Sequence, residues 1–449
     1  MNKVFLFCAL SLVPISAQTP LSLEQCVNVA KEKSASVKEA NQDLEAAKEI
    51  KDQAYTHWFP TVSAQATALK AHEGLVQYSS DGGNLPVYNG DPSTLSSATQ
   101  FAYMPTSTMS MLEQMGVAMI SVVQPIYMGG RISNGNKLAG LGVDVARIQR
   151  IRAEKEAVLA TMDRYYNLAA LHATQATLLA QLQLMDSLNH DVQLAFRNGL
   201  ATSRDTLDLS QRQLTARKQL LDVQDGIQLA EKDLCRSLDG FCSGQLALTD
   251  TLGPLNSPDE IRVDHEQALP KREESQLLDK AVAAEKMQRA QKRGEFLPQA
   301  LVGAAVMEMG DFNDSPTSNA LVFANISVPI SGLWEMSHKD KESRSRVVKA
   351  DLSAQDGKGL IRLEMDKAWN DLLSSWRQLD LVRVRMEKEA TAMKDARQNL
   401  AQGLGKPSDL IATQLGLQAA AEAEIAARRA YLHSRAVYLK ATGREPCSQ

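Results

Sequence analysis

The chain lacks a long hydrophobic run after its first residues. No stretch beyond Ile15 holds eighteen consecutive apolar residues. A transmembrane helix needs about 20 such residues, so none is expected in the mature chain. Open sheet edges and irregular backbone cannot face lipid, so a membrane-spanning part of this chain would have to be a closed β-barrel.

Proline is missing from two long stretches, 126–253 and 330–406. Proline breaks helices, and these stretches are rich in Ala, Leu, Gln, Lys, Arg and Glu, so they predict long helices. The expected helices are 22–57, 131–198, 203–240, 272–295, 334–402 and 407–442. A helix of 68 residues is about 100 Å long. No ordinary globular core is that deep, so these helices are expected to pack side by side as coiled coil.

A strong excess of one charge is also missing. The first residues, Met1-Asn2-Lys3, precede an apolar run from Val4 to Ile15 and then Ser16-Ala17-Gln18. This pattern predicts a signal peptide, residues 1–17; the alternative, a membrane anchor, would need a longer run. The mature chain then has 48 basic and 53 acidic residues, a net charge of −5. That mild balance argues against a nucleic-acid partner.

Cysteine is scarce, with Cys26, Cys235, Cys242 and Cys447 in the mature chain. Four cysteines allow three pairings, and an exported protein can form disulfides. The favoured local pair is Cys235 with Cys242. The alternative is that all four thiols are free and partly buried.

Catalytic motifs are missing as well. Gly405-Lys406 lacks the earlier glycine of a phosphate-binding loop, and Pro407 stands where Ser or Thr is required. The seven histidines are scattered without metal-ligand spacing. We therefore expect no enzyme activity, no cofactor and no metal.

What the chain does contain is a duplication. Gly199-Leu200 and Gly403-Leu404 lie 204 positions apart, and each pair is followed by an aspartate. Two further landmarks recur at nearly the same offset: Gln124-Pro125-Ile126 with Val328-Pro329-Ile330, and Leu238-Asp239-Gly240 with Ala441-Thr442-Gly443. The predicted first repeat, 18–240, contains a strand hairpin at 60–125 and a tip turn at 198–203. A connector, 241–271, leads to the second repeat, 272–443, with its strand hairpin at 298–329 and its tip turn at 402–408. The chain ends in a tail, 444–449.

Each long helix is expected to turn back on itself as an α-hairpin. Gly199 and Gly403 suit the left-handed position after a helix, and Ser203 and Ser408 are expected N-caps of the helices that follow. Leucines or isoleucine recur every seven residues in two series, which predicts coiled-coil seams. The series are Leu207, Leu214 and Leu221, and Leu220, Ile227 and Leu234.

Four segments between the helices alternate apolar and polar residues over about ten positions, as membrane-barrel strands do. They are 61–70, 115–124, 299–308 and 320–328. Aromatic residues, which favour a membrane–water interface, stand at the helix-proximal ends; they are Trp58, Phe59, Tyr127, Phe296 and Trp334. A long Gly/Ser/Asn/Pro-rich loop is expected near 72–113. Each segment alone would equally fit a soluble hairpin.

Four strands cannot close a barrel, so several chains would have to pool theirs. Two chains would give a narrow barrel and three chains a twelve-stranded one with a passage. On the duplicated helix–strand–strand–helix order and the two Gly-Leu turns followed by Asp, the chain resembles the TolC-like outer-membrane efflux proteins. The resemblance implies a mainly helical fold: long α-hairpin coiled coils form a periplasmic tunnel, and four strands per chain enter a trimeric, twelve-stranded transmembrane β-barrel.

The resemblance also implies partners and sites. The homotrimer would sit in the outer-membrane lipid of a Gram-negative bacterium and serve a periplasmic adaptor and an inner-membrane transporter, in efflux or type I secretion. Adaptor contacts would fall at the tips: Gly199, Leu200, Ala201, Thr202, Gly403, Leu404, Gly405 and Lys406. Asp205 and Asp409 would narrow or gate the tunnel.

Simpler interpretations remain open at both sites. Gly-Leu is also an ordinary helix C-cap with its apolar contact, and both aspartates suit a helix N-terminus. This chain departs from the family pattern, since Ala412 stands where a second acid is expected and Gly405 where a basic residue is expected. The alternative for the whole chain is a soluble periplasmic coiled-coil adaptor or structural protein without a barrel.

Overall fold

The computed structural model describes residues 19–72, 76–88, 90–111, 114–199, 201–242, 246–253, 255–310 and 316–447. The expected signal peptide, 1–17, lies outside these residues. The chain divides into two compact units, and each draws on both halves of the sequence. Unit 1 comprises Met1–Glu49, Gly140–Glu285 and Arg346–Gln449; unit 2 comprises Ile50–Ala139 and Lys286–Ser345.

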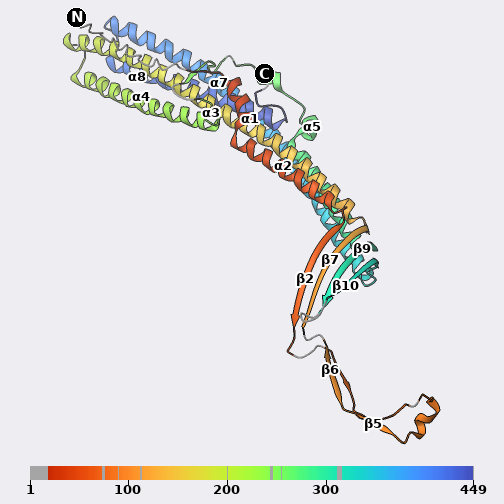
Figure 1. Ribbon diagram of the computed structural model, residues 1–449. Helices are drawn as coiled ribbons and strands as arrows, with labels where there is room; N and C mark the ends of the chain where they lie inside the picture. Colours follow the sequence, from red (N-terminus) through yellow and green to blue (C-terminus); the bar gives the residue numbers. More distant parts are fainter. Residues whose placement is uncertain are drawn as a thin grey trace, which may run out of the picture. The chain divides into compact units, whose positions relative to one another are not determined.

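The order of elements repeats along the chain. Helical residues, two long strands, a long helix, a turn and a shorter helix occur in the first half and again in the second (Figure 1). The helices of this double series are α1 Leu23–Lys33, α2 Ala35–Thr56, α3 Arg131–Arg197, α4 Ser203–Ser237, α6 Glu273–Gly294, α7 Gly332–Ala401 and α8 Pro407–Ala441. No proline lies inside these helices, although Pro407 opens α8, because proline is the residue that most strongly opposes a helix interior.

The expected helix 22–57 is two helices rather than one. Ser34 stands between α1 and α2 with φ −56° and ψ 139°, outside the helical region. Its N–H donates to the Ala30 carbonyl, which ends α1, and its own carbonyl accepts from Val37 and Lys38, which starts α2. The Ser34 and Ser36 hydroxyls lie 3.0 Å apart. The break therefore forms without proline, at a residue whose extended backbone lies between the two helices.

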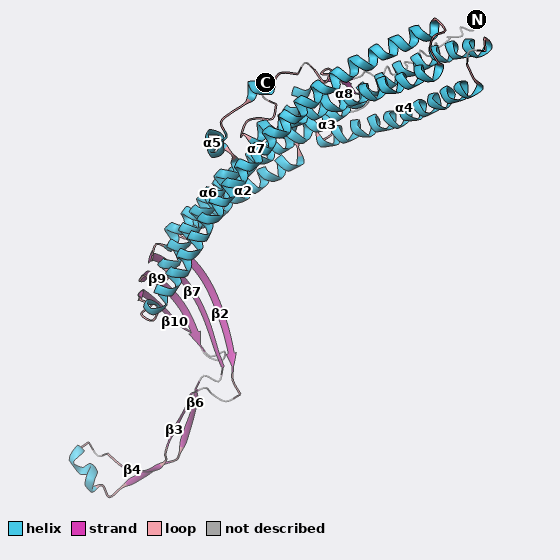
Figure 2. Cartoon of the chain, turned by 180° about the vertical axis from the view of Figure 1, so that it is seen from behind, coloured by secondary structure: helices cyan, strands magenta, loops and turns pink. Residues whose placement is uncertain are grey.

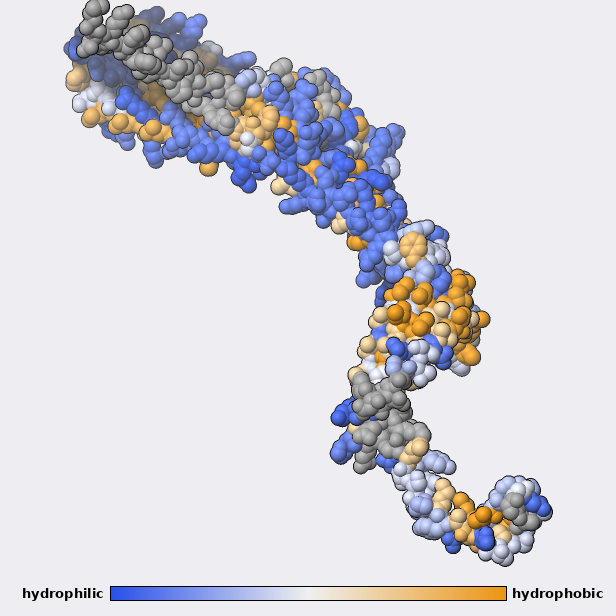
Figure 3. All heavy atoms as spheres, viewed as in Figure 1, coloured by the Kyte–Doolittle hydropathy of each residue, from blue (hydrophilic) through white to orange (hydrophobic). Residues whose placement is uncertain are grey.

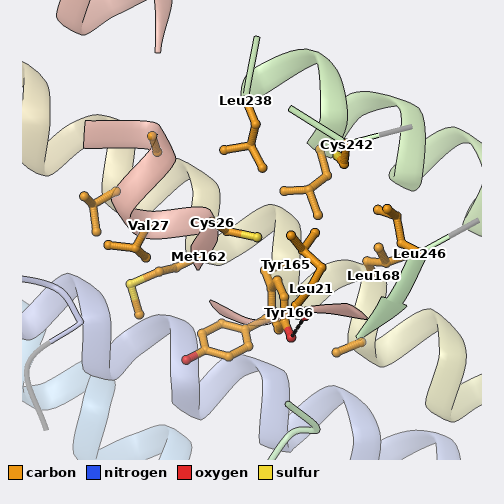
Figure 4. Packing of buried hydrophobic residues seen from close by; sticks show 14 of the residues in the cluster. Leu21, Cys26, Val27, Met162, Tyr165, Tyr166, Leu168, Leu238, Cys242 and Leu246 are labelled. Atoms are coloured by element: carbon orange, nitrogen blue, oxygen red, sulfur yellow. Dashed lines mark hydrogen bonds between the residues drawn. The ribbon is translucent and has the colours of Figure 1, made fainter. Parts of the chain in front are cut away.

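The core of unit 1 joins the chain's N-terminal part to its connector. Strand β1, Thr19–Leu21, pairs in parallel with β8, Leu246–Leu248. The buried Tyr165 of α3 donates its hydroxyl to the Leu21 carbonyl at 3.0 Å, and apolar side chains of α1, α3 and α4 pack around it (Figure 4). The rest of the connector folds as three short helices, η2 Pro258–Ile261, α5 His265–Ala268 and η3 Leu269–Lys271.

A buried arginine ties the second series of helices to the connector. Arg272 is 2% exposed. Its guanidinium donates to the Lys440 carbonyl at 3.0 Å and to Glu364 at 3.0 Å. Nearby, Lys155 binds Glu273 and the carbonyl of Gly443, a residue with φ 78° that ends the turn after α8. A buried charge is costly unless it is paired in this manner.

Unit 2 contains a four-stranded antiparallel sheet in the order β10-β9-β7-β2. Its strands, side by side in Figures 1 and 2, are β2 Thr61–Lys70, β7 Gln114–Met128, β9 Gln299–Gly310 and β10 Thr317–Ser327. The predicted strands fall within or close to these bounds. The register of β7 against β9 shifts between Pro125 and Tyr127, where proline has no N–H to give to the ladder.

The segment expected as a loop near 72–113 carries further secondary structure. It forms two successive antiparallel ribbons, β3 with β6 and β4 with β5, and a 3-10 turn between them. The elements are β3 Val76–Ser80, β4 Gly83–Pro86, η1 Pro92–Ser97, β5 Phe101–Met104 and β6 Ser107–Met111. The turn residues that marked this segment as a loop, such as Gly82 and Pro105, stand between its short strands.

Within the described part of the chain, no helix combines the length and the apolar character needed to cross a membrane.

Candidate functional site

The first tip turn joins α3 to α4. Gly199 has φ 76°, a conformation that glycine adopts without strain, and its N–H donates to the Phe196 carbonyl. Leu200, an expected adaptor contact, lies outside the described residues. The N-cap of α4 is Thr202, so the expectation of Ser203 was wrong. A Thr-x-x-Asp capping box explains the difference, because it places the cap one residue earlier.

The capping box engages Asp205. The Thr202 N–H donates to Asp205 Oδ2 at 2.9 Å, and the Asp205 N–H donates to Thr202 Oγ1 at 3.3 Å. The Thr202 hydroxyl also donates to Asp205 Oδ2 at 2.7 Å. The Thr202 backbone N–H, and after it the hydroxyl, hold the pKa of the Asp205 carboxyl below its usual value.

The second tip turn joins α7 to α8 and has a different chemistry. Gly403, with φ 73°, donates its N–H to the Leu400 carbonyl, and the Leu404 N–H donates to the Asn399 carbonyl. These two bonds define a Schellman motif. The motif commonly buries an apolar contact between the residue after the glycine and the last helical turn. Here the corresponding helical residue is Asn399, and Leu404 is 78% exposed.

The start of α8 is capped by backbone geometry rather than by a side chain. Its N-cap is Lys406, which makes no side-chain capping bond within the described residues, and Pro407 takes the first helical position. The expectation of Ser408 as the cap was wrong, because a proline at the first helical turn places the cap before it. Asp409 is exposed, and Ser408 Oγ at 3.5 Å is its near polar neighbour.

Both tip turns belong to one packed end of unit 1. An apolar cluster beneath them draws side chains from all four helices that meet there. Its buried members are Leu188, Val192, Leu209, Met393, Leu410 and Ile411. The expected tip residues Ala201, Thr202, Gly405 and Lys406 stand in the two turns above this cluster. The fold therefore brings the two halves of the predicted adaptor site together, although they are 204 positions apart in sequence.

The two heptad series on α4 face different surroundings. Ile227 and Leu234 are buried in unit 1, and they form the seam within the chain. Leu207, Leu214 and Leu221 are 67%, 64% and 61% exposed. Seven-residue spacing keeps these three leucines on one side of a supercoiled helix. They form a second seam that the described part of this chain leaves uncovered.

The sheet of unit 2 presents an apolar face to the outside. Val62 on β2, Val122 on β7, Ala304 on β9 and Val322 on β10 stand in one cross-strand row, and Val322 is 86% exposed. The next rows on this face add Ala64, Ile120, Val306 and Ala320 on one side, and Gln124, Val302 and Ala324 on the other. In Figure 3, hydrophobic side chains gather over the sheet. Exposed apolar patches of this kind mark protein or membrane contacts.

The opposite face of the sheet carries a mixed set of side chains. The Ser63 and Ser121 hydroxyls lie 2.8 Å apart across β2 and β7. Phe323 of β10 covers Gly303 of β9, where any side chain would collide with the ring. Ala305 is buried on this face. Within the described residues, the outer edges of β2 and β10 have no strand partner.

The five expected interface aromatics all lie in unit 2, where the helices meet the strands. Trp58, Phe59, Tyr127 and Trp334 are exposed, and Phe296 is half-buried with its ring against Gly332. The sequence analysis missed Tyr55, which is exposed and packs edge-to-face on Phe59 with ring centroids 5.6 Å apart. Phe59 lies in the turn that follows the last residue of α2, Thr56, so helical spacing in the sequence does not identify the pair.

The connector begins at a covalent link. Cys235 of α4 and Cys242 form a disulfide with Cα atoms 5.2 Å apart, which suits the geometry of such a bond. Cys26 and Cys447 are free. Burial raises the pKa of the Cys26 thiol to about 12, so it stays protonated and unreactive. Among the described residues, no three His, Cys, Asp or Glu side chains converge on a metal-sized site.

Comparison with known proteins defines the fold. No family model matches the chain, and no curated protein matches it. Several solved structures do match the chain. The outer-membrane channel OprN matches with a TM-score of 0.73 and 15% identity, over 94% of this chain and 89% of that one. The outer membrane protein VceC of Vibrio cholerae gives 0.68 and 16%, over 94% and 96%. The MtrE outer membrane channel of Neisseria gonorrhoeae, in its open state, gives 0.72 and 13%, over 94% and 89%.

These similarities confirm, at the level of the fold, the resemblance inferred from the repeated sequence. The chain has the fold of outer-membrane channel proteins over nearly its whole length.

Proposed function

We propose that this protein is a TolC-like outer-membrane channel, the exit duct of a tripartite efflux or type I secretion system. It would lie in the outer membrane of a Gram-negative bacterium, with a large part in the periplasm. The observation that carries the proposal is the sheet of unit 2. One of its faces is apolar and exposed, and both of its edges are unpaired within the described residues. Neither property suits a sheet in water.

Oligomerisation would give the backbone hydrogen-bonding groups of both edge strands a partner. If β10 of one copy pairs with β2 of the next, three copies make a twelve-stranded barrel, wide enough for a passage. The apolar row containing Val62 and Val322 would then face lipid. The exposed aromatics near the helix-proximal strand ends would lie at the membrane–water interface.

The exposed seam on α4 supports the same oligomer. Burying a leucine side chain contributes about 1.5–3 kcal/mol. Leu207, Leu214 and Leu221 would bury that surface against a helix of a neighbouring copy. Three copies would then enclose a helical tunnel in the periplasm, with α3 and α7 each about 100 Å long.

The tips are the proposed docking site of a periplasmic adaptor, which connects the duct to an inner-membrane transporter. Exposure of Leu404 supports this role, since the Schellman turn does not use the side chain for its own stability. We assign Leu200 the same role by its repeat position. Asp409, exposed in the first turn of α8, would form a ring of three carboxylates that narrows the tunnel. Asp205 would gate only after release from Thr202.

The sharpest alternative is a soluble periplasmic coiled-coil protein, and cell fractionation separates the two. The duct proposal predicts recovery of the mature protein in the outer-membrane fraction, as a trimer in detergent. It also predicts discrete conductance steps when that trimer is added to planar lipid bilayers. Recovery in the soluble periplasm, with no conductance, would overturn the proposal.

A further inference from the structure

The hairpin of β2 and β7 continues beyond the sheet into an extension, residues 76–111. The extension consists of two antiparallel ribbons, each with only two strands. β3 and β6 pair over five residues, and β4 and β5 pair over four. Isolated two-stranded ribbons are at best marginally stable in water, and three strands or a packing partner are needed. The extension therefore needs another surface to pack against if it is to be stable.

The β4–β5 ribbon exposes large apolar side chains on both faces, and Asn84 is the polar cross-strand partner of Tyr103. Phe101 and Tyr103 stand on one face, and Tyr103 is 73% exposed. Leu85 stands on the other face with Val87, whose N–H extends the ladder to the Gln100 carbonyl. All four side chains are exposed. Figure 3 shows hydrophobic side chains gathered on this part of the extension.

The β3–β6 ribbon differs because it is amphipathic. Tyr78 and Met109 are cross-strand partners on one face, and both are exposed. Ser79 and Thr108 are partners on the opposite face. Water suits the second face, whereas the first exposes the apolar side chains of Tyr78 and Met109.

Charge discriminates among the partners that such a surface could take. Residues 71–130 contain no lysine or arginine. A surface that binds the phosphates of outer-membrane lipids would use basic side chains. The acids of the extension are Asp81 and Asp91, and Asp91 is engaged as the N-cap of η1 by the Ser93 N–H at 3.0 Å. Several copies of the extension can approach one another with little electrostatic repulsion.

The position of the extension in the chain adds a second argument. It continues the hairpin that contains β2, and β2 is an outer edge of the sheet. In the proposed trimer this edge meets the neighbouring copy. We propose that the extensions of the three copies pack on one another through Phe101, Tyr103 and Leu85. They thereby form an intersubunit cap on the strand end of the duct. This inference rests on the proposed function, since it requires the trimer.

Disulfide cross-linking of the full-length protein tests the contact. In a Cys447→Ser background, Tyr103→Cys should give a covalent dimer of the chain on oxidation in intact cells. Thr108→Cys, on the polar face of the β3–β6 ribbon, is the matched control and should give several-fold less. Equal yields from the two variants, or a Tyr103→Cys adduct with another protein, would contradict the inference.

Trimer stability provides a second measurement. Replacing Phe101 and Tyr103 with serine should lower the temperature at which the purified trimer dissociates in detergent, whereas Thr108→Ser should leave it unchanged. An unchanged temperature in the double variant would count against the contact. Native mass spectrometry distinguishes loss of the extension contact from absence of the trimer. A trimer without the Tyr103→Cys cross-link overturns only the extension contact, whereas a monomeric wild-type protein overturns the proposed duct and this contact with it.

Discussion

Thr202 and Asp205 bind each other through three hydrogen bonds at the start of α4. The equivalent positions of the second repeat, Lys406 and Asp409, show no such side-chain capping bond within the described residues. The two copies of the Gly-Leu turn therefore differ in what their aspartates do. Asp205 stabilises its helix, whereas Asp409 is exposed in the first turn of α8. We infer that the two repeats differ in role. The first has a turn stabilised by a side-chain cap, and the second presents an exposed carboxylate.

Thr202→Ala should destabilise the first turn of α4, because it removes the hydroxyl from the capping box. Loss of an N-cap costs about 0.5–2 kcal/mol. A loss of about 1 kcal/mol corresponds to roughly fivefold faster amide exchange, measured by hydrogen–deuterium exchange of residues 203–206. Ser408→Ala is the control, and it should leave exchange at the start of α8 unchanged. Equal effects of the two changes would contradict the cap assignment.

The same cap should respond to pH in a defined direction. The pKa of Asp205 is lowered in the folded state, so its carboxylate contributes stability above its usual pKa of about 4. That contribution is lost as the pH falls through the lowered value. Exchange at the start of α4 should therefore be flat between pH 7 and about pH 5 after correction for intrinsic rates, and should accelerate below about pH 4. In Asp205→Asn this acid-induced step should disappear.

Leu404→Asp should abolish export and leave the trimer in the membrane. Substitution of an exposed side chain usually changes stability by less than about 0.5 kcal/mol, so the loss should arise from the partner. The measurement is substrate efflux together with adaptor cross-linking. Gln402→Asp places the same charge in the same turn without removing the leucine, and it should retain export. Full export by Leu404→Asp would remove the adaptor assignment.

Asp409→Ala should raise single-channel conductance or weaken the preference for cations, because three carboxylates would leave the narrow end of the tunnel. Planar bilayer recordings at low salt measure both quantities. The difference from wild type should shrink near 1 M salt, where the screening length is about 3 Å. If conductance and selectivity are the same in both proteins, Asp409 acts only at the start of its helix.

Leu214→Lys should prevent assembly of the trimer. It places a charge in the middle of the exposed leucine seam of α4, where a neighbouring copy is proposed to pack. Sedimentation of the protein in detergent measures the result as a shift from trimer to monomer. Leu214→Met conserves volume and should assemble normally. A trimer that tolerates the lysine would place the intersubunit contact elsewhere.

Val322→Arg should impair insertion into the membrane, because the side chain stands on the apolar face of the sheet. Arginine at the middle of a barrel's lipid face costs about 2–4 kcal/mol. The amount of folded protein in the outer-membrane fraction measures the effect. Asn325→Arg changes the same strand on the opposite face and should insert at close to the wild-type level. Similar losses in both variants would argue against a lipid-facing Val322.

The sequence by itself determined the order of the elements and most of their bounds. The two long stretches without proline became α3, α4 and α7, because they are rich in helix formers and lack the residue that most strongly breaks a helix. Alternating residues located the four strands of the sheet for a similar reason. The break at Ser34 and the ribbons near 76–111 escaped prediction, because a single extended residue and strands of four or five residues leave weak periodic signals.

Only the tertiary structure decided which surfaces are left uncovered. Both leucine series on α4 have the same seven-residue spacing, and packing alone shows that Leu234 turns into the chain while Leu214 turns away from it. The Gly-Leu turn could have buried Leu404 on its own helix, and exposure of that side chain follows from Asn399 opposite it. Periodicity marks the positions that need a partner. Whether that partner belongs to the same chain or to another one depends on which other elements of the fold pack over the position.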